Sequence, residues 1–402
     1  MSKVYIVAAK RTAIGKFSGS LASMEAADLA AEVIKNILEE TKINPANINE
    51  VICGNILMAG KKQGIARQAA IKAGIPAEVP AYGINMICGS GMKSVILAYA
   101  NIKAGLADVI LAGGTESMSN SGFILPQVAR NGNKMGDMTL LDHMVTDGLT
   151  DAFQGYHMGI TAENIAEKYG ITREAQDEFS YNSQRKAIAA IDAGMFKKEI
   201  VPINIVSKKE TIVVDTDEYP NRATNLEKLA TLRPAFKKDG TVTAGNASGI
   251  NDGASFVMLA SEEAAKKYGL TPLVEIVGVG QGGVEPAVMG LGPVPAIKNA
   301  LNNANMKLTD IEVVELNEAF AAQSLGVIKL LCEEHNVSRE WIDERTNLNG
   351  GAIALGHPIG ASGNRITVSL IYEMMRSGKT FGLASLCIGG GMGTAVILKK
   401  SF

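Results

Sequence analysis

The feature that most constrains the fold of this 402-residue chain is a pattern that occurs twice. Residues 50–55 (EVICGN) and 312–317 (EVVELN) are short β-branched runs that each end at an asparagine. Further along, Ser90-Gly91 and Ser362-Gly363 each precede an apolar helical stretch, which is followed by an apolar run ending in glycines, DVILAGG or LASLCIGGG. Because strand, Ser-Gly turn, helix and strand recur in the same order, the sequence predicts two similar α/β halves rather than one long sheet.

The two helical stretches, residues 92–105 and 364–378, carry few charges and lack a polar face. A helix that is apolar nearly all round is normally buried, so we expect both to lie in a central layer between sheets. Residues 118–251 differ, with loops rich in Gly, Asn, Asp and Met and two polar helical segments, TAENIAEKYG and TREAQDEFSYNSQRKAIAAIDAG. We expect this interval to cover a site or an oligomer contact, although a surface excursion would have the same composition.

Charge and cysteine content exclude several classes of protein. Lys and Arg total 39 against 41 Asp and Glu, so no strong overall field indicates a nucleic acid or anionic membrane partner. The N-terminal apolar run is too short for a signal peptide and no run is long enough to cross a bilayer, so we expect a cytoplasmic protein. Cys53, Cys88, Cys332 and Cys387 form no Cys-x-x-Cys pair, which argues against a disulfide framework and a structural zinc site.

The segment NMICGSGMKSV places Cys88 directly ahead of a Gly-Ser-Gly turn and an apolar helix. Unpaired backbone N–H groups and the helix dipole favour an anion at a helix N-terminus, and a thiolate is such an anion. This position can lower the pKa of a thiol from its usual value of about 8.5, which indicates a nucleophile. Packing is the alternative, because free cysteine is among the most buried residue types.

Two later segments strengthen the catalytic interpretation. In NLNGGAIALGHPIGASGNR, His357 is the only titratable side chain among glycines and small residues before Arg365, which suits a general base. In SLCIGGGMGTAV, Cys387 ends a strand immediately before a glycine run, and ligands of open α/β sheets bind at strand ends. The alternatives are a structural histidine and a buried small hydrophobe.

The glycine-rich segments do not fit a nucleotide-binding loop. The Walker A pattern requires a glycine at position 373, where the chain has Glu373 before Gly378-Lys379-Thr380. In the dinucleotide pattern, Gly89 and Gly91 fit, but Ser94 replaces the third glycine.

Five segments, in order, resemble those of the thiolase family, specifically its short-chain biosynthetic members: NMICGSGMKSV, GNASGINDGA, ELNEAFAAQ, NGGAIALGHPIGASG and LCIGGGMGTA. The resemblance spans essentially the whole chain. It implies an α/β thiolase fold, with duplicated halves in a five-layer αβαβα sandwich and an inserted loop domain. The implied division is residues 1–117 with 252–272 for the N-terminal half, 118–251 for the loop domain, and 273–402 for the C-terminal half.

The resemblance also implies a reaction, a reversible Claisen condensation of two acetyl-CoA to acetoacetyl-CoA plus CoA by an acyltransferase. Cys88 matches the nucleophile that forms an acetyl thioester, His357 the base that activates it, and Cys387 the acid/base of the condensation step. Asn317 of NEAF matches a group that holds a water in the enolate oxyanion hole together with His357. The backbone N–H groups of Cys88 and Gly389 match the hole for the tetrahedral intermediate.

On the substrate side, the resemblance implies an acyl pocket and a coenzyme A channel. His157, Met158 and Met289 match residues around the acyl pocket, and Ser248 matches a contact to the pantetheine arm. Arg222 is the candidate for the nucleotide, although Asn221 stands where many members have arginine. Coenzyme A is substrate and product, so no cofactor or metal is expected, and the family likeness suggests a homotetramer. Residues 332–347 look longer than usual, and they have no assigned function.

Two other functions stay open. One is a thiolase-fold relative with different chemistry, either a decarboxylating condensing enzyme or a degradative thiolase for longer 3-ketoacyl-CoAs. Decarboxylating relatives typically pair their cysteine with two histidines, or with a histidine and an asparagine, so Cys387 argues for the non-decarboxylating type. The other is a non-catalytic CoA-binding protein, against which the presence of Cys88, His357 and Cys387 argues.

Overall fold

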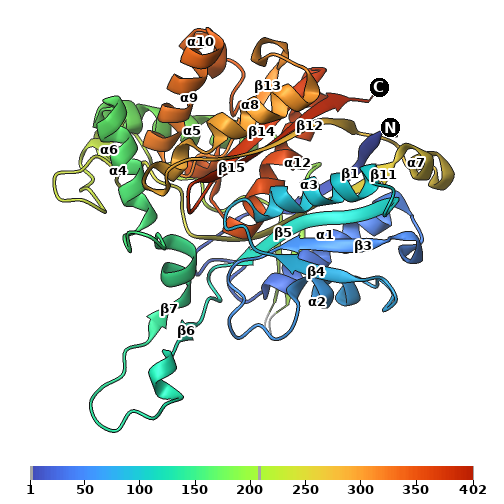
Figure 1. Cartoon of the computed structure of the whole chain (residues 1–402), viewed down its shortest axis with the longest axis horizontal. Coiled ribbons are helices and arrows are strands. Elements are labelled where there is room, and N and C mark those ends of the chain that lie inside the picture. The colour runs from blue at the N-terminus through green and yellow to red at the C-terminus, as the bar shows by residue number, and fades with distance from the viewer. Residues whose placement is uncertain (1–2, 207–209, 402) are drawn as a thin grey trace.

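The computed structural model describes residues 3–206 and 210–401, and its main feature is one continuous sheet of eleven strands (Figure 1). Along the sheet, the strand order is β13-β14-β15-β12-β1-β11-β5-β3-β4. In that order the strands are β13 (Val313–Leu316), β14 (Phe381–Ile388), β15 (Met392–Lys400), β12 (Val274–Gly283), β1 (Val4–Thr12), β11 (Asn251–Ser261), β5 (Val109–Ser117), β3 (Glu50–Gly54) and β4 (Ala81–Ile84). Two short strands attach at the side, β2 (Gly15–Lys16) to β11 and β8 (Ile200–Val201) to β1.

The join between the halves differs from the expectation of two separate sheets. Strands β13, β14, β15 and β12 form one group and β1, β11, β5, β3 and β4 the other, and the two groups meet where Tyr5 and Ile6 pair antiparallel with Glu275 and Val274. An unpaired inner edge would expose backbone N–H and C=O groups. The short pairing satisfies some of these groups and links the two half-sheets into one.

Two helices form the central layer, as the apolar sequence pattern predicted. Helix α3 (Ser90–Lys103) and helix α12 (Ile359–Ser377) pack on each other and contact strands of both half-sheets. Their N-terminal ends approach closely because the repeated Ser-Gly turns supply glycine at the contact. A Cβ on Gly91 would lie 2.9 Å from the backbone of Gly360, and one on Gly363 would lie 2.6 Å from the backbone N of Met92. Larger residues would push the two helices apart.

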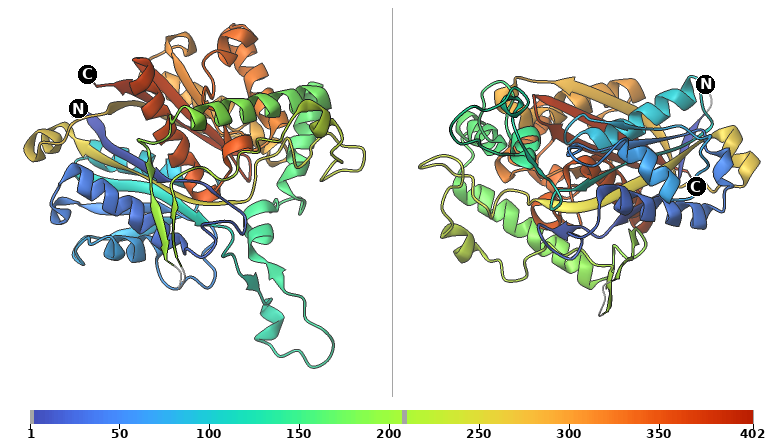
Figure 2. Two further views of the ribbon diagram at one scale, coloured as in Figure 1. Left: turned by 180° about the vertical axis from the view of Figure 1, so that it is seen from behind. Right: turned by 90° about the horizontal axis from the view of Figure 1, so that it is seen from below.

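Further helices cover the outer faces and complete the five layers (Figures 1 and 2). Helix α1 (Ala26–Thr41) and helix α2 (Ile65–Lys72) cover the N-terminal half-sheet, and α8 (Pro293–Ala304) covers the C-terminal one beside α9 (Ala321–His335). The apolar residues of α1 recur at helical spacing, with Leu29, Val33 and Ile37 fully buried. The other α-helices described outside residues 118–250 are α7 (Glu262–Tyr268), α10 (Arg339–Asp343) and α11 (Ala352–Leu355).

Residues 118–250 contain the two helices that the sequence predicted there, α4 (Met158–Tyr169) and α5 (Arg173–Asp192). Strands β6 (Phe123–Ile124) and β7 (Leu141–Asp142) pair at the base of an arm that projects from the body of the molecule (Figures 1 and 2). The interval also holds β9 (Ile203–Val206), β10 (Thr211–Val214) and α6 (Leu226–Ala230). The exact division into an inserted loop domain and two halves stays a prediction. Within the described residues, no helix combines the length and apolar character needed to cross a bilayer.

Candidate active site

A cavity of about 570 Å³ lies ahead of the N-termini of α3 and α12 and draws its wall from both halves of the chain. It brings together most of the residues that the sequence singled out. These are Cys88, His157, Met158, Ser248, Met289, His357, Cys387 and Gly389. Segments almost 300 residues apart in the sequence thus contribute to one site.

Cys88 lies two residues before the first residue of α3, in a turn fixed by Ser90. The Ser90 hydroxyl accepts from the backbone N of Met86 at 2.8 Å and donates to the carbonyl of Ile87 at 2.7 Å. Burial raises the pKa of the Cys88 thiol to about 11, while hydrogen bonds from the backbone N–H groups of Gly389 and Cys88 itself act in the opposite direction. The sequence argument for a lowered pKa is therefore wrong for the free protein, because desolvation outweighs the helix end.

His357 lies two residues before α12 and is held on both sides. Its backbone N donates to Oδ1 of Asn251 at 2.9 Å, and its Nδ1 lies 2.6 Å from Oγ of Ser362, whose hydroxyl also lies 2.9 Å from the carbonyl of Pro358. Burial, and then the positive charge of Arg365, lower the pKa of the imidazole to about 3. With Cys88 near 11, the resting pair is a neutral thiol and a neutral imidazole.

Cys387 is the second-to-last residue of β14, and its side chain is almost fully buried, at 1% exposure. Burial raises the pKa of its thiol, and the nearby Cys88 raises it further. The chain then turns sharply into β15 through Gly390 and Gly391, whose φ values of 86° and 89° favour glycine. This turn carries the N–H of Gly389 to the sulfur of Cys88, which places the predicted acid/base and the predicted nucleophile in one neighbourhood.

Asn317 is not part of the cavity wall, but its backbone bonds to the strand that carries Cys387. It follows β13, and its backbone N donates to the carbonyl of Ser385 at 3.0 Å, two residues before Cys387. Its side chain is buried, and Oδ1 accepts from Nη2 of Arg365 at 3.4 Å. Among the described residues, no protein atom pairs with Nδ2. That amide nitrogen is thus a buried donor without a protein partner.

An aromatic cluster forms the wall around the predicted acyl pocket. The ring of His157 stacks on Phe236 with centroids 4.5 Å apart, and Phe236 meets Phe320 edge to face at 6.2 Å. Met158 and Met289 are buried beside them. The sequence analysis missed both phenylalanines. Phe320 could have been found within the ELNEAFAAQ motif, whereas Phe236 lies in a loop that carries no signal of its own.

The structure does not bring Arg222 to the cavity. Its guanidinium is exposed and forms a two-pronged ion pair with Asp192, at 3.0 and 2.5 Å. Its predicted contact with the nucleotide stays a prediction. A smaller cavity of about 360 Å³ adjoins the first and shares Lys16, Tyr219 and Ala244 with it.

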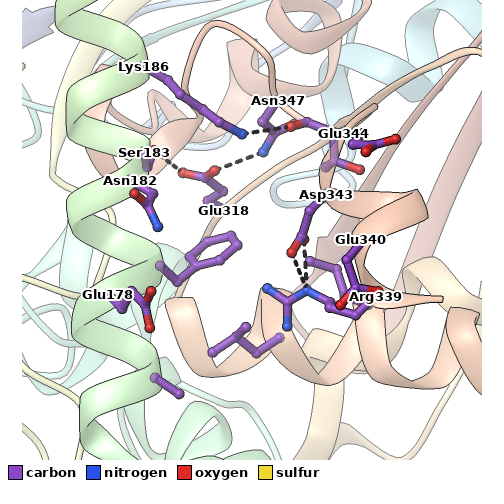
Figure 3. Close-up of a pocket in the computed structure, with 15 residues that line it drawn as sticks. Glu178, Asn182, Ser183, Lys186, Glu318, Arg339, Glu340, Asp343, Glu344 and Asn347 are labelled. Atoms are coloured by element: carbon purple, nitrogen blue, oxygen red, sulfur yellow. Dashed lines mark hydrogen bonds and ion pairs between the residues drawn. The ribbon is translucent and has the colours of Figure 1, made fainter.

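A second large cavity, of about 680 Å³, lies among α5, α9 and α10 and is bounded by part of the unexplained segment 332–347 (Figure 3). Its polar groups bond to one another. Arg339 donates to both carboxylate oxygens of Asp343 at 2.7 Å, and Glu318 accepts from Ser183 and Asn347 (Figure 3). None of the predicted site residues lines this cavity. In the described part of the chain, no group of His, Cys, Asp or Glu side chains is arranged to hold a metal ion.

Both halves of the chain match known family models. Residues 4–263 match the model described as the N-terminal domain of thiolase, and residues 270–400 match that of its C-terminal domain. An acetyl-CoA acetyltransferase of Chromobacterium violaceum is 54% identical over 399 residues, covering 99% of this chain and 100% of that protein. An acetyl-CoA acetyltransferase of Escherichia coli is 53% identical over 400 residues, covering 100% of both. The solved structure of acetyl-CoA acetyltransferase from Syntrophomonas wolfei matches with a TM-score of 0.97 at 44% identity, over 100% of both chains.

Proposed function

The chain belongs to the thiolase family of acyltransferases, and from this membership we propose that it is an acetyl-CoA C-acetyltransferase. It condenses two acetyl-CoA molecules reversibly to acetoacetyl-CoA and CoA, by a ping-pong mechanism with an acetyl-enzyme on Cys88. The observation that carries the proposal is the cavity in which the Cys88 sulfur, flanked by two backbone N–H groups, shares the wall with His357 and Cys387.

The first half-reaction loads Cys88. Because Cys88 is a thiol and His357 a neutral imidazole at rest, the imidazole must take the proton as the sulfur attacks. The sulfur bonds to the acetyl carbon, the bond from that carbon to the CoA sulfur breaks, and His357 returns the proton to the CoA sulfur. The N–H groups of Cys88 and Gly389, which already meet at the Cys88 sulfur, suit the oxyanion of the tetrahedral intermediate.

The second half-reaction is clearest in the direction of thiolysis. The Cys88 sulfur bonds to C3 of acetoacetyl-CoA, the C2–C3 bond breaks, and Cys387 gives its proton to C2, which leaves as acetyl-CoA. Burial favours the protonated thiol of Cys387, the form that this step needs. The proton that Cys88 gave to His357 restores Cys387, and the proton of the incoming CoA thiol restores Cys88. Condensation runs the same steps backward.

Short acyl groups fit the wall of the cavity best. Met158 and Met289 are buried beside the His157–Phe236 stack. These side chains fill the space that a longer acyl chain would occupy. Ser248 lines the same cavity and is proposed to contact the pantetheine arm. The adjoining cavity at Lys16 and Tyr219 offers a path toward the nucleotide, for which Arg222 remains the proposed partner. The proposed reaction needs no resident cofactor, because Cys88, His357, Cys387 and the CoA thiol exchange all the protons that it moves.

The exposed apolar surface of the arm that carries β6 and β7 is consistent with the proposed homotetramer. Its apolar side chains are unusually exposed for a single chain, with Phe123 66% exposed, Met135 93% and Leu140 56%. We assign this surface to contacts between copies. Size-exclusion chromatography with light scattering tests the subunit number, and a monomer would contradict it. A reducing, cytoplasmic location is proposed because Cys53, Cys88, Cys332 and Cys387 are all free thiols.

Steady-state thiolysis of a series of 3-ketoacyl-CoA substrates tests the proposed substrate. Acetoacetyl-CoA should be cleaved to acetyl-CoA, and kcat/KM should fall by about tenfold or more when the acyl chain is lengthened by two carbons. A preference for the longer chains would instead indicate a degradative thiolase.

A further inference from the structure

Arg365 is a buried cation on α12, the helix whose first residue, Ile359, lines the catalytic cavity. It is 1% exposed, and its Nη2 donates to Oδ1 of Asn317 at 3.4 Å. Nδ2 of Asn317, also buried, has no protein partner among the described residues. The guanidinium therefore holds the oxygen side of this amide and leaves the NH2 side as the donor. A side-chain amide held in this way cannot rotate by half a turn, which would exchange its oxygen and nitrogen, without losing that hydrogen bond.

The position of Arg365 on α12 links it to His357. Ser362 and Arg365 lie three residues apart on the helix, and side chains at this spacing project from the same side. Ser362 contacts Nδ1 of His357 at 2.6 Å, and Arg365 contacts Asn317. One face of one helix thus contacts both residues that the family resemblance assigns to the enolate oxyanion hole, His357 and Asn317.

The charge of Arg365 is poorly neutralised. Among the described residues, the one carboxylate within ion-pair distance is Glu315, 3.9 Å from Nη1. Burial raises the pKa of Glu315 in spite of Arg365, which favours the neutral carboxyl group and weakens its pairing with the guanidinium. Arginine itself keeps its charge in proteins. Its field reaches the cavity, where it lowers the pKa of His357.

We propose that Arg365 is a positioning residue for the enolate step, an assignment that rests on the proposed function. By holding Oδ1, it leaves Nδ2 of Asn317 as the donor to the water that, by the family resemblance, completes the enolate oxyanion hole together with His357. Without the guanidinium, the amide is free to present Oδ1 instead, and the donor that holds this water is lost. Acetyl transfer to Cys88 uses the N–H groups of Cys88 and Gly389 instead of Asn317, so loss of Arg365 reaches that step only through His357, whose pKa would rise and whose basicity would not fall.

The test compares the two half-reactions in Arg365→Met, Asn317→Ala and the combined variant. Acetylation of Cys88 by acetyl-CoA is followed by rapid quench and intact mass. The enolate step is followed as exchange of the acetyl-CoA methyl protons in D2O. Arg365→Met should slow exchange by about a hundredfold, the usual effect of losing one oxyanion donor, while acetylation is not slowed. The combined variant should exchange no more slowly than Asn317→Ala, because Arg365 acts through Asn317.

Glu315→Gln is the matched control, since it alters the same buried pair without touching Asn317, and it should keep both rates. If Arg365→Met does not fold, as judged by thermal unfolding, Arg365→Lys replaces the guanidinium fork by one ammonium and should show the same selective loss of exchange. Equal loss of both rates, or losses that add in the combined variant, would overturn the assignment. A wild-type enzyme that is never acetylated would refute the proposed function itself, before any variant is measured.

Discussion

Nδ1 of His357 lies 2.6 Å from Oγ of Ser362, and the same hydroxyl lies 2.9 Å from the carbonyl of Pro358. A serine hydroxyl has one proton and two lone pairs. When it donates to Pro358, it accepts from Nδ1–H and leaves Nε2 as a base. When it turns to donate to Nδ1, the ring carries its proton on Nε2 and becomes a donor. One contact therefore lets His357 act first as a base for Cys88 and later as a donor to the enolate.

Removal of this hydroxyl should weaken His357 without dismantling the site. We expect Ser362→Ala to slow acetylation of Cys88 by about tenfold, a part of the hundredfold or more that a well-placed base contributes. The measurement is rapid-quench acetylation with acetyl-CoA. Thr367→Val is the control, because the Thr367 hydroxyl of the same helix is also buried but bonds only to the carbonyl of Gly363. Equal effects of the two substitutions would contradict a special role for Ser362.

The raised pKa of Cys88 predicts how the free thiol reacts with an alkylating reagent. With a pKa of about 11, the thiolate fraction should rise about tenfold for each pH unit between 7 and 10. Alkylation of Cys88 by iodoacetamide, quantified by peptide mapping, should therefore accelerate throughout this range. A rate that is already level near pH 7 would reveal a thiolate–imidazolium pair and contradict the neutral resting state.

Cys387 should matter for only one half-reaction. Cys387→Ala removes the proton donor and acceptor of the carbon–carbon step, so we expect condensation and thiolysis to fall by about a hundredfold or more while Cys88 is still acetylated by acetyl-CoA. Parallel assays of the acetyl adduct and of acetoacetyl-CoA formation check this. If both activities declined together, the division of labour between the two cysteines would be wrong.

The aromatic wall depends on a glycine. A Cβ at Gly159 would lie 2.2 Å from Cδ2 of Phe236, so Gly159→Ala should push Phe236 off the ring of His157. Overpacking of this kind costs about 1–3 kcal/mol, and we expect roughly a tenfold rise in KM for acetyl-CoA. Since alanine favours a helix more than glycine does, α4 itself should persist. Gly122→Ala, where a Cβ meets open space, is the control, and an unchanged KM in both variants would argue against this packing.

Much of the architecture could be predicted because it follows from local pattern. The apolar stretches after Ser90-Gly91 and Ser362-Gly363 are the buried central helices, and the repeated glycines are required where those helices touch. The motifs around Cys88, His357 and Cys387 indicated a common site, and the structure brings the three side chains to one cavity. These features depend on residues close together in the sequence.

Other features depend on contacts between distant segments and could not be predicted. The raised pKa of Cys88 follows from the burial of its sulfur, which no local motif reports. Phe236 reaches the acyl wall only through tertiary packing with His157. The orientation of Asn317 depends on Arg365, 48 residues away, although both lie in motifs that the sequence analysis had identified. The join of the half-sheets at Tyr5 and Glu275 likewise links two strands far apart in the chain.

The most direct test of the acetyl-enzyme is the intact mass of the purified protein after brief exposure to acetyl-CoA, followed by peptide mapping. One acetyl group on the Cys88 peptide, removed by hydroxylamine and absent from Cys88→Ala, is the expected result. CoA should still bind to that variant. Repeated absence of an adduct from the wild-type protein, with CoA binding intact, would contradict the covalent mechanism and favour a protein that binds CoA without turnover.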